Sequence, residues 1–332
     1  MKFLNQYKSI KKLLVILTIL NLVACDNKLD INAPYKQIPV IYGFVNKNEA
    51  FQFIRVQKVF QNSVDINAKD AAKISDSLYL PNLSVQIIYI KSNGRDTVNC
   101  TRIDSIDKNA GFFANDKNFI YRSDYYVIQS DVIKADLLVK DTILGNEYTL
   151  LEPIQIIGGQ EIASRNITVS DDPAKRINFI YSLNRSAYIV DAAIRLKYYE
   201  YPIANPTSVV LKYYDYYLQS GLITSLLPDE VSIRIISKVL LDDWRSYFKN
   251  QPKDVNRKFA SVEYVTWGAG PEFLEIQEIS KPNVSFVQKR TDYSNIKNAL
   301  GIFAARTMNV QTDVTFDPAS IDLISEMQQF EK

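Results

Sequence analysis

The sequence predicts a mainly β protein whose second half adds helices. We expect an N-terminal immunoglobulin-like β-sandwich, residues 38–160, followed by an α+β domain, residues 161–332. Three observations predict this. Short β-rich runs separated by turn residues fill the first half, as in a sandwich. A polar, turn-rich stretch at residues 158–175 follows and marks the boundary. After it, longer β-rich runs and segments of helical periodicity take over.

The first half begins with two predicted strands. Residues 38–46 (IPVIYGFVN) are rich in β-branched and aromatic residues. Residues 49–60 are ambiguous, because Ile54 and Val56 alternate with polar residues while other apolar positions fit helical spacing. We favour a strand, since a polar turn of only a few residues separates the segment from the preceding strand.

The clearest element of the first half is a β-hairpin. Two β-rich runs flank Asn93-Gly94, a dipeptide that tolerates the positive φ angles of a tight hairpin turn. Residues 119–128 and 146–157 continue the pattern. The first half therefore contains six or seven short predicted strands.

The second half is predicted to combine long strands with helices. Residues 176–202 and 208–219 are expected to be long strands, and residues 227–250 a helix. The expected apolar stripe of that helix recurs at intervals of three and four residues. It consists of Ile236, Val239, Leu240, Trp244, Tyr247 and Phe248. Residues 270–280 suggest a short helix. Residues 315–330 suggest a terminal one, with Asp317 as its N-cap and Pro318 in its first turn.

Residues 1–24 have the pattern of a bacterial lipoprotein signal peptide. Four lysines and no acidic residue precede Cys25, and the apolar core, residues 13–20, is far shorter than the roughly 20 residues of a membrane-spanning helix. The end of the segment, residues 22–25 (LVAC), resembles a lipobox, in which the cysteine becomes the acylated first residue, carrying chains such as palmitate. The alternatives are an ordinary signal peptide or an uncleaved anchor. Residues 25–37 then form a tether, and two or more acyl chains hold a protein firmly to a membrane.

Acylation of Cys25 leaves Cys100 without a disulfide partner, since the chain has two cysteines. We expect Cys100 to be a small core residue. Removal of residues 1–24, which carry four lysines and no acidic residue, takes the net charge from +2 to −2. This near-neutral balance argues against a nucleic-acid partner.

Composition also limits the possible chemistry. The chain has no histidine, which excludes His-based triads and His-held zinc or haem. No phosphate-binding glycine loop is present, and the spacing of Ser294 and Lys297 lacks the motifs that accompany a Ser-Lys catalytic pair. We therefore expect no enzyme activity, no metal and no cofactor. The alternative is a carboxylate-dependent surface glycan hydrolase, whose two carboxyl groups need not be close in sequence.

Tyrosines gather in two predicted strands of the second half. They are Tyr198, Tyr199, Tyr201, Tyr213, Tyr214, Tyr216 and Tyr217. Because successive strand residues face opposite sides of a sheet, each cluster presents tyrosine on both faces. One set should be packed and the other exposed as a binding surface for a glycan, a peptide or a protein. Cross-strand tyrosine pairs that only stabilise the sheet are the alternative.

The lipobox, the predicted sandwich and residues 293–306 (YSNIKNALGIFAAR) together resemble a group of Bacteroidota outer-membrane lipoproteins of unknown function. Members often carry a Ser-Asn-Ile…Gly-Ile-Phe segment near the C-terminus, which Ser294, Asn295, Ile296, Gly301, Ile302 and Phe303 match. Ala299 stands where glycine is expected. The resemblance implies a lipid-anchored protein of the outer membrane, exposed at the cell surface and often linked to TonB-dependent transporters. It implies no catalytic residues, so we expect a binding protein or an accessory subunit.

Overall fold

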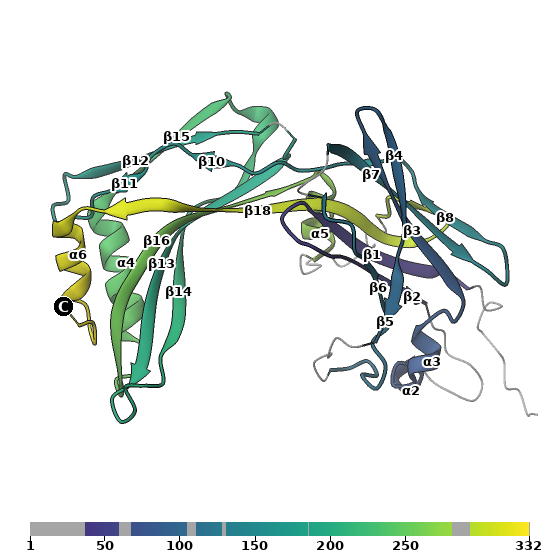
Figure 1. Cartoon of the computed structure of the whole chain (residues 1–332), viewed down its shortest axis with the longest axis horizontal. Helices are drawn as coiled ribbons and strands as arrows, with labels where there is room; N and C mark the ends of the chain where they lie inside the picture. Colours follow the sequence, from purple (N-terminus) through teal and green to yellow (C-terminus); the bar gives the residue numbers. More distant parts are fainter. Residues whose placement is uncertain are drawn as a thin grey trace, which may run out of the picture.

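The computed structural model describes residues 37–59, 68–104, 111–127, 131–184, 186–280 and 293–331. The predicted signal peptide and Cys25 lie outside the described residues. Within the described part the chain is mainly β, and its strands form several sheets (Figure 1). The β-rich character predicted from the sequence is therefore confirmed.

The largest sheet has nine strands and crosses the whole molecule. Their order is β14-β13-β16-β18-β1-β2-β6-β5, and β11 also pairs with β18. The strands are β1 (Pro39–Asn46), β2 (Gln52–Lys58), β5 (Thr101–Ile103), β6 (Ile120–Ser123), β11 (Asn166–Ile167), β13 (Ile189–Pro202), β14 (Val210–Ile223), β16 (Val255–Ala269) and β18 (Leu300–Phe316).

Strand β18 joins the two lobes of the molecule, as Figure 1 shows. Its first residues pair in parallel with β1, and its later residues pair in antiparallel fashion with β16. Arg306 belongs to both ladders, because it lies opposite Asn46 of β1 and Ala269 of β16. One continuous strand, β18, therefore takes part in the sheet pairings of both lobes.

A six-stranded sheet completes the first lobe. Its order is β17-β8-β7-β3-β4, with β9 on β7. The strands are β3 (Leu83–Lys91), β4 (Gly94–Asn99), β7 (Val132–Asp141), β8 (Glu147–Leu150), β9 (Ile154–Gln155) and β17 (Ile296–Lys297). Short helices α2 (Ala68–Ala71) and α3 (Ser75–Leu78) also belong to this lobe.

The two sheets of the first lobe share a hydrophobic core. Ile41 of β1, Ile54 of β2 and Ile87 of β3 are fully buried in it. Across the sheets, the hydroxyl groups of Tyr89 and Ser123 lie 3.2 Å apart. The two initial strands and the Asn93-Gly94 hairpin are confirmed, and Gly94 has the positive φ (146°) that such a turn requires.

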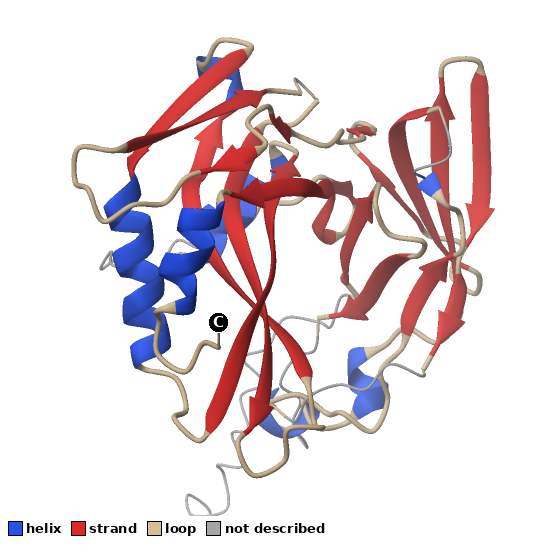
Figure 2. Cartoon of the chain, turned by 60° about the vertical axis from the view of Figure 1, so that its left-hand side comes forward, coloured by secondary structure: helices blue, strands red, loops and turns tan. Residues whose placement is uncertain are grey.

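The second lobe packs helices and a small sheet on one face of β13, β14, β16 and the end of β18. The small sheet has the order β10-β12-β15. Its strands are β10 (Glu161–Ile162), β12 (Arg176–Ser182) and β15 (Glu230–Ile236); the helices of the second half are α4 (Ser237–Lys249), α5 (Glu272–Ser280), α6 (Pro318–Ser325) and a 3₁₀ turn, η2 (Thr224–Leu226). Figure 2 shows α4 and α6 side by side next to the large sheet. Trp244 and Phe248 of α4 are fully buried in the core.

The predicted helix at residues 227–250 is wrong in its first part. Residues 230–236 form strand β15, which pairs along its length with β12, and helix α4 begins only at Ser237. The reason is visible in the strand itself, where Val231, Ile233 and Ile235 alternate with exposed polar residues. A period of two with β-branched residues favours a strand.

Two further sequence expectations need correction. Val239, expected on the buried stripe of α4, has a side chain that is 49% exposed, and Leu241 is buried instead. The single long strand expected at residues 176–202 is two strands, β12 and β13, which belong to different sheets. By contrast, the short helix α5 and the Asp317 cap of α6 are confirmed, since the Asp317 carboxylate accepts a hydrogen bond from Ser320 N.

The expected division at residue 160 does not follow the sheets near the C-terminus. Residues 294–306 fall within the expected second domain, yet β17 pairs with β8, and the start of β18 pairs with β1. These pairings place the segment in the first lobe. Local sequence cannot reveal such pairings, because they join residues more than 140 positions apart.

Candidate functional site

The tyrosine-rich strands β13 and β14 present two different faces. We call the face covered by α4 and α6 the inner face, and the opposite one the outer face. Tyr198 is 1% exposed, whereas Tyr199 is 42% and both Tyr213 and Tyr217 are 57% exposed. The alternation predicted from the sequence, with one packed and one exposed set, is confirmed for these residues.

The inner tyrosines have structural contacts. Tyr198 packs edge-on against Phe248 of α4, with ring centroids 5.0 Å apart. Tyr214 stacks on Tyr247 at 3.9 Å, and its hydroxyl donates a hydrogen bond to Asp243 Oδ2 at 2.9 Å. Burial and this hydrogen bond raise the pKa of Tyr214 to about 12. Tyr216 is also partly buried against the core. We therefore assign Tyr198, Tyr214 and Tyr216 to packing.

Strand register brings the exposed tyrosines together on the outer face. Tyr199 and Lys197 are two residues apart on β13, so they share a face, and Tyr213 of β14 lies opposite Lys197. Tyr217 lies opposite Ala193 on the same side. Tyr201 is partly exposed, and its hydroxyl is hydrogen-bonded to Glu331.

Ion pairs between strands hold the outer face in place. The Arg195 guanidinium makes two hydrogen bonds to the Asp215 carboxylate, at 2.7 and 2.8 Å, and Lys197 pairs with Glu263 at 2.7 Å. Hydrogen bonding to Asp215 raises the pKa of Arg195. The same guanidinium lies over the Tyr213 ring, 4.1 Å from its centroid. This contact restricts the Tyr213 ring before any partner binds, so less side-chain entropy is lost on binding.

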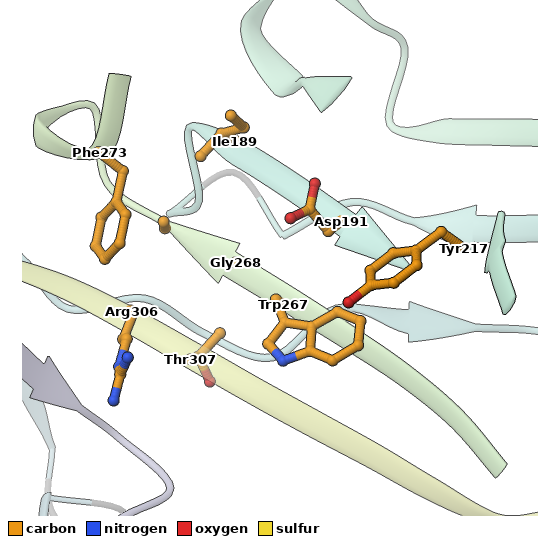
Figure 3. A pocket seen from close by; sticks show the side chains of 9 residues that line it. Ile189, Asp191, Tyr217, Trp267, Gly268, Phe273, Arg306 and Thr307 are labelled. Carbon is orange, nitrogen blue, oxygen red and sulfur yellow. The ribbon is translucent and has the colours of Figure 1, made fainter. Parts of the chain in front are cut away.

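A pocket of about 280 Å³ lies at the lobe-junction end of this face (Figure 3). Trp267 of β16 and Tyr217 stack there, with ring centroids 5.7 Å apart and planes inclined by 23°. Asp191 of β13 lies opposite Trp267 in the strand ladder. Arg306 belongs to β18, which pairs with the edge of β16 opposite to the one that pairs with β13, and it lies opposite Ala269, two residues from Trp267. Ile189, Gly268, Ala269, Phe273 and Thr307 complete the lining.

Sequence reasoning identified Tyr217 but missed Trp267, Asp191 and Arg306. Trp267 lies in a segment rich in β-branched and aromatic residues, so the sequence could have indicated that it belongs to a strand, with Glu263 and Val265 on the same face. Its neighbours were not, because residues 191, 267 and 306 meet only through the pairing of three strands. Among the described residues that line the pocket, Asp191 is the single carboxylate.

The described residues contain no group of three or more His, Cys, Asp or Glu side chains placed to hold a metal ion. Cys100 is partly buried against the first-lobe core, and burial raises the pKa of its thiol to about 12. A thiol with so high a pKa remains protonated at neutral pH and is a poor nucleophile. The predicted packing role of Cys100 agrees with this environment.

Over the part of the chain that the structure describes, no helix combines the length and apolar character needed to cross a bilayer. No protein-family model and no curated protein matches the chain.

Three of the solved structures that resemble the chain are distant from it. The C-terminal globular domain of an oligosaccharyltransferase from Pyrococcus abyssi is 10% identical over 68% of this chain and 45% of that one, with a TM-score of 0.20. The calcium-binding domain CBD12 of CALX1.1 is 9% identical over 81% of this chain and 98% of that one, with a TM-score of 0.17. CBD12 from CALX1.2 is 8% identical over 82% and 100%, also with a TM-score of 0.17. Scores this low carry no argument about fold or function.

Proposed function

We propose that this chain is an outer-membrane-anchored lipoprotein with a non-enzymatic binding role, exposed at the cell surface. Acylated Cys25 is its anchor. It acts as an accessory subunit of an outer-membrane complex, of the kind built around a TonB-dependent transporter, or as a ligand-binding module. The lipobox at residues 22–25 and the resemblance of residues 293–306 to Bacteroidota surface lipoproteins support this location at the outer membrane.

The observation that carries the binding role is the outer face of β13 and β14. Scattered exposed apolar residues are ordinary on a protein surface, but a group of neighbouring ones is typical of an interaction site. Tyr199, Tyr213 and Tyr217 form such a group and are at least 42% exposed. Each offers a large, rigid contact area with a hydroxyl group at its tip.

We also propose that the first lobe is an immunoglobulin-like β-sandwich and that the second lobe is an α+β domain. The two sheets that share the core of the first lobe support the former. The glycan-hydrolase alternative gains no support from the pocket, whose described lining offers Asp191 as its single carboxylate, whereas such enzymes use two.

The test is capture from detergent-solubilised outer membrane of the source bacterium, with mass spectrometry of retained proteins and glycans. The bait is the full chain, compared with the double variant Tyr199→Ala/Tyr213→Ala. Tyr42→Ala is the matched control, because Tyr42 is 47% exposed but lies on β1 in the first lobe. We expect a partner retained by the wild type and the control and lost from the double variant. Equal retention by all three baits contradicts the proposal.

A further inference from the structure

We propose that the pocket formed by Trp267, Tyr217, Asp191 and Arg306 binds a single ring of a neutral sugar. This inference rests on the proposed binding function and specifies its ligand. The pocket lies on the outer face, and Tyr217 belongs both to the exposed tyrosine group and to the pocket. A longer glycan seated in the pocket would continue along the outer face toward Tyr213.

The first argument is the aromatic floor. Trp267 and Tyr217 are stacked with their planes inclined by only 23°, and Tyr217 is more than half exposed. The face of an aromatic ring carries negative charge, so it attracts the polarised C–H groups of a flat, saturated ring. Because the two rings are stacked, each covers part of the other, and the free apolar surface is the outer side of Tyr217 together with the uncovered part of the partly exposed Trp267 ring.

The second argument is the hydrogen-bonding character of the pocket's two sides. Asp191 Oδ1 accepts hydrogen bonds from Ser220 Oγ at 3.2 Å and from Gly221 N at 2.5 Å, which fixes the carboxylate. Within the described part of the chain its Oδ2 atom has no hydrogen-bond partner. Ionised carboxylates only accept hydrogen bonds, and guanidinium groups only donate them. Asp191 therefore supplies an acceptor on one side of Trp267.

Arg306 supplies donors on the other side. Its guanidinium makes a distant contact of 3.5 Å with Glu49 and lies 5.4 Å from the centroid of the Phe44 ring. Its side chain is 47% exposed, so it keeps N–H groups available to a ligand. A hydroxyl group both donates and accepts hydrogen bonds, and a ring carrying several hydroxyls satisfies Asp191 and Arg306 together.

The third argument concerns charge and size. An anionic ligand is repelled by Asp191 and a cationic one by Arg306, so the pair favours a neutral, hydroxyl-rich molecule. The volume of about 280 Å³ is at the small end of ligand pockets, which suits one sugar ring rather than a folded peptide. Apolar surface beneath and polar groups at the rim are the usual arrangement of such sites.

The chain offers a built-in probe for this proposal. It has two tryptophans, and Trp244 is fully buried, so acrylamide quenching reports mainly on Trp267. Soluble protein without residues 1–24 is titrated with neutral hexasaccharides that differ in sugar and linkage, and with a neutral hexapeptide. We expect at least one hexasaccharide to protect Trp267 from acrylamide, and the peptide to give no protection.

Variants identify the site. Asp191→Asn and Arg306→Gln should each weaken sugar binding by about tenfold or more, because each removes a hydrogen bond to a charged group. Glu147→Gln, an exposed carboxylate on β8, is the control and should leave binding unchanged. Circular dichroism checks that all variants fold.

Protection of Trp267 by none of the hexasaccharides, or by the peptide alone, overturns the inference. Normal sugar binding by both pocket variants overturns it as well. Since the capture experiment uses Tyr199 and Tyr213, its result stands independently of these outcomes.

Discussion

The side chain of Asn295 takes the place of a strand neighbour for the backbone of Phe303. Asn295 Nδ2 donates to Phe303 O at 2.7 Å, and Phe303 N donates to Asn295 Oδ1 at 3.0 Å. Asn295 is 8% exposed, so both hydrogen bonds are shielded from water. This relationship gives a physical role to the Ser-Asn-Ile…Gly-Ile-Phe segment: it ties the start of β18 to the first lobe.

Asn295→Ala should destabilise the protein by about 2–6 kcal/mol. The substitution leaves a buried N–H and a buried C=O of Phe303 unpaired, and each such group costs roughly 1–3 kcal/mol. Urea unfolding measures the change. Asn99→Ala is the control, because Asn99 is exposed on β4 and its Oδ1 atom accepts a solvent-exposed hydrogen bond from Gln86 Nε2. A loss below about 1 kcal/mol for Asn295→Ala would show that water replaces the lost bonds.

Gly301→Ala should destabilise the protein by more than about 3 kcal/mol, because the backbone strain alone costs about 1–3 kcal/mol and the collision adds to it. Gly301 has φ = +115°, and a Cβ atom there would lie 1.9 Å from the carbonyl oxygen of Ile41. Both the backbone strain and the collision with β1 act against alanine. Gly111→Ala is the matched control, since nothing lies within 4 Å of its Cβ position. Equal thermal unfolding temperatures for the two variants would refute the assignment.

The two tyrosine faces should respond differently to truncation. Tyr198→Ala removes a fully buried ring that packs on Phe248, so we expect a loss of about 3–5 kcal/mol. Tyr213→Ala removes an exposed ring and should cost less than about 1 kcal/mol. Chemical denaturation of each single variant separates the two roles. Similar losses would mean that the outer tyrosines are structural as well.

Asp317 should make stability depend on pH at the acidic end. Hydrogen bonds from Thr168 and from Ser320 lower the pKa of its carboxyl group in the folded state. A depressed folded pKa means that the stabilisation is complete above the unfolded value of about 4 and is lost as pH falls through the folded pKa.

Asp317→Ala should therefore cost about 0.5–2 kcal/mol at neutral pH, the usual cost of losing an N-cap. The difference in unfolding free energy between wild type and variant should shrink as pH is lowered below about 4. Asp322→Ala, in the middle of α6, is the control. A wild-type advantage that stays constant down to pH 2 would contradict the capping role.

Cys25→Ser should release the protein from membranes. The lipobox at residues 22–25 makes Cys25 the proposed acylation site, and the acyl chains are the proposed anchor. Metabolic labelling with an alkyne fatty acid and fractionation after a carbonate wash measure acylation and attachment. Cys100→Ser is the control and should keep the label. Continued membrane attachment of Cys25→Ser would mean that something other than a lipid holds the chain.

Sequence alone determined the features that depend on near neighbours. Strand alternation separated Tyr198 from Tyr199, and the Asn93-Gly94 turn and the Asp317 cap were recognised because each acts within a few residues of chain. Local reasoning failed at residues 230–236, because the helical spacing of α4 was extended backward over a segment in which Val231, Ile233 and Ile235 alternate with polar residues; its partner residues lie 48 to 60 positions away.

Tertiary structure decided everything that depends on distant pairing. Strand registers pair β18 with β1 and place Arg306 in the ladders of both lobes. They also bring Asp191 next to Trp267. A register depends on the combined burial of a whole strand face, and a shift of one residue exchanges the two faces. The tyrosines could therefore be assigned to alternating sets from sequence, but only the folded sheet shows which set faces solvent and that a pocket adjoins it.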